Sequence, residues 1–190
     1  MSDRHAGVHL APFGSFGHVR NWVFDLDNTL YPAECDLFAE IDTRMTDFVS
    51  GLLQLPRDEA RKIQKKYYAE HGTTLSGLMT IHGIDPADFL HYVHEIDLSP
   101  LPDLPILRAA LEILPGRKFV YTNGSRRHAE RVTEKMGLGH VFHGSFGIED
   151  AAYAPKPRPA SYEAFRTLHD VDPYESIFFE DLARNLAPAK

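Results

Sequence analysis

The sequence predicts an α/β fold in which helices cover a parallel sheet. Three short apolar runs each end in polar residues, namely Trp22-Val23-Phe24, Lys118 to Tyr121 and Ser176 to Phe179. Stretches with helical periodicity separate these runs, which indicates right-handed crossover connections between parallel strands. The polar residues that follow the strands would then meet at one edge of the sheet, where ligands bind in such folds.

The first predicted strand, Trp22-Val23-Phe24, is followed directly by "DLDNT" at residues 25–29. A short apolar run of this kind is typical of a parallel strand that is buried on both faces. Residues 1–20 contain glycine, histidine, serine and proline but no continuous apolar segment, so we expect a flexible N-terminal tail and no signal peptide.

The segment from residue 33 to residue 100 separates the first two strands and is too long for a loop. Its apolar residues recur at helical spacing, and Pro, Thr, Asp and Gly stand where helices begin and end. Four helices are expected: one over 37–53, one from Pro56 to Gly72, one from Thr73 or Thr74 to Gly83, and one beginning at Asp85-Pro86. We therefore predict a helical domain at 33–100, inserted into an α/β core formed by 21–32 and 101–190.

The remaining elements of the core follow from the same signals. A helix over 104–114 returns the chain to the sheet, and the strand at 118–121 comes next. A helix over 125–137 is expected to end at Gly137, because glycine is common at helix C-termini. A third strand lies within 141–148, where glycines interrupt the pattern, and a helix over 159–168 precedes the last strand.

Charge and cysteine content exclude several classes of protein. The 190 residues carry a formal net charge of −7, so we expect no nucleic acid polymer as a partner, although a small phosphorylated substrate remains compatible. The one cysteine, Cys35, excludes an internal disulfide and suits a reducing compartment, so we expect a cytoplasmic protein. No apolar run approaches the length of a membrane span, so no membrane partner is expected. The oligomeric state is left open.

Chemically reactive residues stand at the predicted strand ends and before the last strand. Two aspartates at this spacing are by themselves best explained by an Asx turn that caps backbone N–H groups. The combination is far less common, and it comprises Asp25, Asp27, Thr122, Asn123, Lys156, Glu180 and Asp181. The sequence therefore indicates a site at this edge of the sheet.

Four short motifs, "FDLDNTL", "YTNGS", "KPRP" and "FFEDLARN", resemble those of the haloacid dehalogenase-like phosphohydrolase superfamily. The resemblance extends from Asn21 to the end of the chain and implies a Rossmann-like core with a small helical cap at 33–100. The stretches "FDLDNTLYP", "YAEHGTTLSGL" and "IEDAAYAPKPRPASY" are most similar to the pyrimidine 5′-nucleotidase branch.

The resemblance assigns a role to each candidate residue. It implies that Asp25 attacks the phosphoryl group to form an aspartyl-phosphate, and that Asp27 is the general acid and base. Lys156 would neutralise charge, while the Thr122 hydroxyl and the backbone N–H groups of Asn28 and Asn123 would bind the phosphate. Mg²⁺ is the implied cofactor, and its ligands would be Asp25, Asp181 and the backbone carbonyl of Asp27, with Glu180 ranked below them.

Several alternatives remain at this stage. Dehalogenases of the superfamily hydrolyse an ester without the second aspartate, so Asp27 favours a phosphatase. The expected substrate is a small phosphorylated metabolite, in the first place a nucleoside monophosphate of the pyrimidine type, with sugar phosphates and phosphoglycolate as alternatives. The alternative to an enzyme is a non-catalytic protein that keeps the fold as a binding module.

Some residues of the predicted cap are also candidates for the site. Tyr67, Tyr68 and His71 could stack on a base, but packing between cap helices is favoured for the two tyrosines. His91 and His94 are expected to be solvated. The family continues beyond the fourth motif with a further helix and an edge strand, so the core is expected to be incomplete at its C-terminal end. The chain is then either natively short or part of a longer one.

Overall fold

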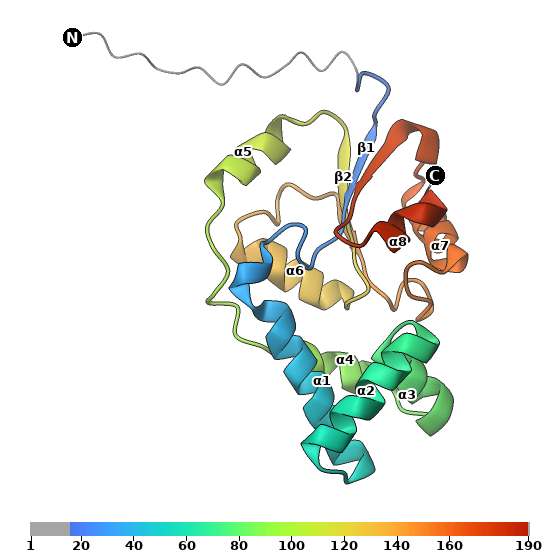
Figure 1. Ribbon diagram of the computed structural model, residues 1–190. Helices are drawn as coiled ribbons and strands as arrows, with labels where there is room; N and C mark the ends of the chain where they lie inside the picture. Colours follow the sequence, from blue (N-terminus) through green and yellow to red (C-terminus); the bar gives the residue numbers. More distant parts are fainter. Residues whose placement is uncertain (1–15, 190) are drawn as a thin grey trace, which may run out of the picture.

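The computed structural model describes residues 16–189 and confirms the predicted α/β fold (Figure 1). Within these residues the sheet has four parallel strands in the order β3-β2-β1-β4. They are β1 (Asn21–Phe24), β2 (Arg117–Tyr121), β3 (Gly144–Phe146) and β4 (Ser176–Phe179). The third strand is shorter than the apolar pattern at 141–148 indicated.

Helices cover both faces of the sheet because side chains alternate along each strand. Trp22 and Phe24 of β1 belong to the same apolar cluster as Val132 of α6 (Arg126–Lys135). Val23, between them in the chain, belongs to a second cluster with Phe165 of α7 (Pro159–His169). The core therefore has three layers, with β1 near the middle and its four residues buried.

Four helices lie within the segment 33–100, as the sequence predicts, and they are drawn together below the sheet in Figure 1. They are α1 (Leu37–Leu53), α2 (Arg57–His71), α3 (Thr74–His82) and α4 (Pro86–His94), preceded by a short 3₁₀ turn, η2 (Ala33–Cys35). Side-chain caps set two of the starts: Thr73 accepts a hydrogen bond from the Ser76 N–H, and Asp85 accepts one from the Ala87 N–H.

A close contact joins α2 and α3. A Cβ atom at Gly77 would lie 2.5 Å from the Cβ of Tyr67, so only glycine allows the two helices to approach this closely. Tyr67 is buried, and its hydroxyl lies 2.8 Å from His82 Nε2. The expectation that Tyr67 packs between helices is therefore confirmed.

The remaining elements connect and close the core. They are α5 (Pro105–Ile113), η3 (Pro173–Glu175), α8 (Ala183–Leu186) and η4 (Ala187–Ala189). β4 lies at one edge of the described sheet, and Phe179 at its end is 41% exposed although its ring stacks on Phe24. The end of the last strand is thus only partly covered by the described residues.

The end of the predicted N-terminal tail packs against the sheet. Val19 is buried, and the Phe16 ring contacts Trp22 edge-on with centroids 6.1 Å apart. The backbone N–H of Arg20 donates to the carbonyl of Glu175. Residues 1–15 of the predicted tail lie outside the described part of the chain. Among the helices at 16–189, none combines the length and the apolar character that a membrane crossing requires.

Candidate active site

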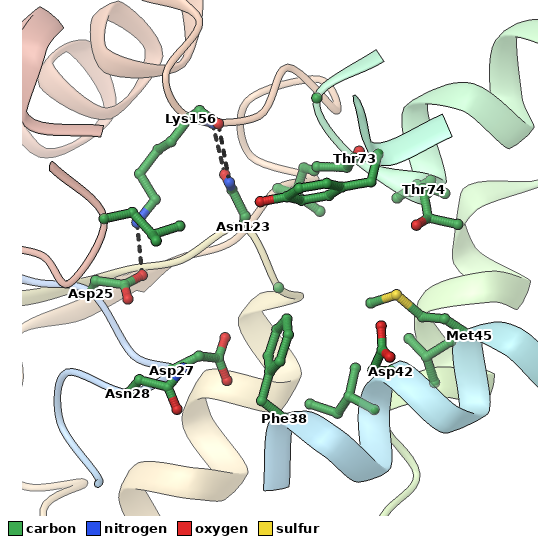
Figure 2. A pocket seen from close by; sticks show the side chains of 18 of the residues that line it. Asp25, Asp27, Asn28, Phe38, Asp42, Met45, Thr73, Thr74, Asn123 and Lys156 are labelled. Carbon is green, nitrogen blue, oxygen red and sulfur yellow. Dashed lines mark hydrogen bonds and ion pairs between the residues drawn. The ribbon is translucent and has the colours of Figure 1, made fainter. Parts of the chain in front are cut away.

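A cavity of about 410 Å³ lies between the carboxyl ends of the strands and helices α1 to α4 (Figure 2). Its core wall, as we name it, comprises Asp25, Asp27, Asn28, Asn123, Lys156, Glu180 and Asp181. Its helical wall comprises Phe38, Asp42, Met45, Lys65, Tyr68, Leu75 and Phe89, among other residues. Of the predicted site residues, Thr122 alone is absent from this lining.

Asp25 follows β1 directly and is fixed from several sides. Its backbone N–H donates to the carbonyl of Phe179, which extends the pairing of β1 with β4. Its Oδ1 accepts a hydrogen bond of 2.7 Å from Lys156 Nζ, and its Oδ2 accepts one of 3.3 Å from the Thr29 hydroxyl. Burial raises the pKa of Asp25 to about 7, against the opposing effect of the Lys156 charge.

Lys156 is the cation at the centre of the core wall. Its ammonium is buried and donates to Asp25 Oδ1 at 2.7 Å, to Glu180 Oε2 at 2.6 Å and to the carbonyl of Tyr121 at 2.9 Å. These three acceptors use all three N–H donors of an ammonium. Lys156 is therefore held in one position without any ligand.

Asn123 holds the backbone of Lys156 in place. The Asn123 Oδ1 accepts from the Lys156 N–H at 2.7 Å, and its Nδ2 donates to the Lys156 carbonyl at 3.2 Å, as the dashed lines in Figure 2 show. The side chain of Asn123 is thus occupied by the neighbouring loop. A contact between Asn123 and a phosphate would therefore involve its backbone.

Three carboxylates gather beside Lys156. Oxygen atoms of Asp25, Glu180 and Asp181 lie within 4.8 Å of one another. Burial raises the pKa of Asp181, and the neighbouring Glu180 raises it too, first through a hydrogen bond and then through its charge. Three acids share one lysine, so the cluster carries an excess of negative charge on oxygen ligands. This arrangement fits a hard divalent cation such as Mg²⁺.

Asp27 has surroundings of a different kind. Its Oδ1 accepts a hydrogen bond of 2.5 Å from the Tyr31 hydroxyl and lies 3.8 Å from His128 Nε2. Burial opposes ionisation of Asp27, but His128, Tyr31 and His94 together lower its pKa below the ordinary value. The two aspartates of the first motif are therefore shifted in opposite directions.

Two histidines lie behind Asp27. The rings of His94 and His128 stack with centroids 4.4 Å apart, and His94 Nδ1 lies 3.0 Å from the Ser125 hydroxyl. Burial lowers the pKa of His94 to about 3, which keeps it neutral. The expectation that His94 is solvated is wrong, because the end of α4 packs against α6. Its position four residues after Leu90, on the apolar face of the helix, was the available signal.

The remaining predicted phosphate ligands differ in access to the cavity. Asn28 lines it with φ +60°, a conformation that asparagine tolerates better than most residues. Thr122 is buried, and its hydroxyl accepts a hydrogen bond of 2.9 Å from the Gly124 N–H. Gly124 itself lines the cavity. The Thr122 hydroxyl thus contacts a residue of the lining but does not itself belong to the lining.

The helical wall is mostly apolar and carries two exposed aromatic rings. Phe38 on α1 is 45% exposed and points into the space opposite Asp27 in Figure 2. Tyr68 on α2 is 41% exposed, and the guanidinium carbon of Arg184 lies 5.2 Å from its ring centroid. The expectation that Tyr68 packs between helices is therefore wrong. Neighbours in the sequence, Tyr67 and Tyr68 lie on different faces of α2.

Comparison with known proteins supplies a relative and several similar folds. A protein of Saccharomyces cerevisiae named Phosphate metabolism protein 8 is 28% identical over 176 residues, which cover 83% of this chain and 54% of the yeast protein. The chain thus spans about half the length of that curated relative.

Two solved structures show the same fold at low identity. A HAD phosphatase from Thermococcus onnurineus has a TM-score of 0.59 at 18% identity, covering 90% of this chain and 81% of that one. The L-2-haloacid dehalogenase from Xanthobacter autotrophicus has a TM-score of 0.53 at 18% identity, covering 90% and 73%. A family model described as hydrolase, haloacid dehalogenase-like hydrolase, matches residues 19–190. Since this match covers most of the sequence, the chain belongs to the haloacid dehalogenase-like hydrolase family.

Proposed function

We propose that this chain is a Mg²⁺-dependent phosphomonoesterase that works through an aspartyl-phosphate. One observation carries the proposal. Asp25 and Lys156 are buried as a pair beside Glu180 and Asp181, while Asp27 is held separately by Tyr31. A nucleophile, a cation, a metal-binding cluster and a second acid are the parts that phosphoryl transfer through a carboxylate requires.

In this proposal Asp25 attacks phosphorus while the bond to the leaving oxygen breaks. Lys156 offsets the charge of the phosphoryl oxygens, which the Thr122 hydroxyl and the backbone N–H groups of Asn28 and Asn123 also bind. Asp27 gives its proton to the leaving oxygen and then takes one from the water that hydrolyses the aspartyl-phosphate. A bound phosphate dianion favours the protonated form of Asp27, because it adds negative charge nearby.

Asp25, Asp181 and the backbone carbonyl of Asp27 are the proposed metal ligands. Glu180, which belongs to the same cluster of carboxylates, ranks below them as a metal ligand. When bound, Mg²⁺ supplies positive charge against the phosphoryl oxygens. We expect turnover to cease in EDTA and to return when excess Mg²⁺ is added. Full activity in EDTA would contradict a metal role.

Phosphatase chemistry is favoured over dehalogenation by Asp27, which an ester mechanism does not need. The yeast relative, named for phosphate metabolism, supports the same choice. We further propose that residues 33–100 form a cap over a core made of 21–32 and 101–190, in a cytoplasmic protein. This division places the helical wall on the cap.

The proposed substrate is a pyrimidine nucleoside 5′-monophosphate. A base would lie against the helical wall, where Phe38 and Tyr68 present exposed rings beside apolar side chains. A purine carries an extra ring, which a cavity of about 410 Å³ accommodates less easily. A sugar phosphate or phosphoglycolate would make little use of the aromatic rings.

The test is a phosphate-release assay with Mg²⁺ on UMP, CMP, AMP, GMP, glucose 6-phosphate and phosphoglycolate. We expect kcat/KM to be highest for UMP or CMP. Equal values for purines and pyrimidines would overturn the pyrimidine assignment only. A sugar phosphate or phosphoglycolate ahead of every nucleotide would move the substrate to another class. If no phosphate is released from any of these phosphomonoesters, a non-catalytic binding module is the better explanation.

A further inference from the structure

Tyr31 lies at the end of the loop that carries both catalytic aspartates. Its side chain is 1% exposed, and its hydroxyl donates to Asp27 Oδ1 at 2.5 Å. Burial, together with the nearby charge of Asp27, raises the pKa of Tyr31, so the hydroxyl keeps its proton and remains a donor. A buried ring of this size has little freedom, which fixes the position of the hydroxyl.

His128 lies near the same oxygen of Asp27. His128 Nε2 lies 3.8 Å from Asp27 Oδ1, and the His128 ring is fully buried against His94. Within residues 16–189, Asp27 Oδ2 receives no hydrogen bond, although Asp27 lines the cavity (Figure 2). The two oxygens of one carboxylate therefore differ: Oδ1 is held by the protein, and Oδ2 is left for a ligand.

We propose that Tyr31 is a positioning residue that holds Oδ1 of Asp27 so that Oδ2 exchanges the proton with the substrate. The inference rests on the proposed phosphatase function. As the bond between phosphorus and the leaving oxygen breaks, the proton on Oδ2 moves to that oxygen. In the second step Oδ2 takes a proton from the attacking water, phosphate leaves, and the Asp25 carboxylate is restored.

Substrates with different leaving groups separate this role from a structural one. An alkoxide, as in UMP, needs a proton when it leaves, whereas 4-nitrophenolate is stable without one. Correct positioning of a general acid therefore matters for UMP and much less for 4-nitrophenyl phosphate. A general loss of folding or of phosphate binding would affect both substrates alike.

The experiment measures kcat and KM of the Tyr31→Phe variant on both substrates with Mg²⁺. We expect kcat for UMP to fall about tenfold or more, which is a part of the roughly 10²- to 10⁴-fold that general acid–base catalysis supplies. For 4-nitrophenyl phosphate we expect a fall of less than about threefold. KM should change little for either substrate, because Tyr31 has no contact with the cavity side of Asp27.

Tyr67→Phe is the matched control, because Tyr67 is also a buried tyrosine with a hydrogen-bonded hydroxyl, here to His82. It should leave both rates unchanged. His128→Asn is the second variant, and it tests the orientation of Asp27 if Tyr31→Phe does not fold. Its activity on UMP should fall more than its activity on 4-nitrophenyl phosphate, but by a smaller factor than in Tyr31→Phe.

The outcomes distinguish failure of the proposed phosphatase function from failure of the positioning role of Tyr31. Wild-type protein that hydrolyses neither substrate would overturn the proposed function, and this inference with it. Active wild-type protein whose Tyr31→Phe and His128→Asn variants lose equal activity on both substrates, or lose none, would overturn the positioning role alone.

Discussion

The two walls of the cavity are built on opposite physical principles. On the core wall, charged groups that are buried or half-buried are fixed by partners: Lys156 has three acceptors, and Asp25 and Asp27 each have hydrogen-bond donors. On the helical wall, apolar side chains such as Phe38 and Met45 face the space without directional contacts of this kind.

This difference bears on what each wall can do. A buried charge is costly without its partner, so the core wall tolerates little movement or substitution. Apolar contacts are not directional, and a change of shape on the helical wall costs little as long as the helices still pack. We infer that the core wall supplies the chemistry and the helical wall selects the substrate.

The largest effect is expected from Asp25→Asn. The amide cannot form the aspartyl-phosphate, so kcat should fall by about three orders of magnitude or more while the protein still folds. Asp42→Asn is the control on the helical wall, where we expect turnover to stay within about tenfold of wild type. Circular dichroism checks the fold of both variants. Activity of Asp25→Asn above about a tenth of wild type would exclude a nucleophilic role.

Lys156→Met should destabilise the protein, because it leaves the carboxylates of Asp25 and Glu180 buried without their cation. Breaking a buried pair in this way costs about 3–5 kcal/mol. The pKa of the Asp25 carboxyl, which burial already raises, would then rise further in the folded state, because the Lys156 charge that opposes this effect is gone. A raised pKa means that folding binds protons, so the loss should be small at pH 5 and grow as the pH rises towards 8.

The control for this variant is Lys65→Met on the helical wall. Lys65 pairs with Asp42 at 2.6 Å, but its side chain is 51% exposed, and an exposed pair contributes only about 0–1 kcal/mol. Urea unfolding of both variants at pH 5 and pH 8, without metal, measures the difference. Equal losses for the two lysines would contradict the contrast between the walls.

A smaller effect on rate is expected from Phe38→Ala. Removal of the ring deletes a stacking surface worth about 1 kcal/mol, so kcat/KM for UMP should fall about fivefold. The fall should be smaller for a substrate without a base, such as phosphoglycolate. Steady-state kinetics on the two substrates test this, and an identical fall for both would remove Phe38 from substrate selection.

Much of the core could be predicted from the sequence because local patterns determine it. The strand at Ser176–Phe179 has the predicted boundaries, and Thr73 and Asp85 cap their helices as helix-start signals indicate. The strand ends gather acids and a lysine because parallel strands point their carboxyl ends to one edge. These features depend either on residues that are close in the sequence or on the general arrangement of strands in a parallel sheet.

The partners of Asp27 could not be predicted in the same way. His94 and His128 meet only because α4 packs on α6, a contact between segments more than thirty residues apart. Tyr67 and Tyr68 have the same chemistry in adjacent positions, and only the packing of α2 on α3 buries the first and leaves the second beside the cavity. Helical spacing after Leu90 indicates that His94 is buried, but no local signal shows which segment it meets.

The most direct test of the contrast between the walls is the ratio of kcat/KM for UMP to that for AMP. Both substrates lose the same kind of 5′-alkoxide, so Tyr31→Phe on the core side should lower both values and leave the ratio within about twofold of wild type. Phe38→Ala on the helical wall should lower the ratio towards one, because it removes a surface that contacts the base. A changed ratio in Tyr31→Phe together with an unchanged ratio in Phe38→Ala would contradict the division of chemistry and selection between the two walls.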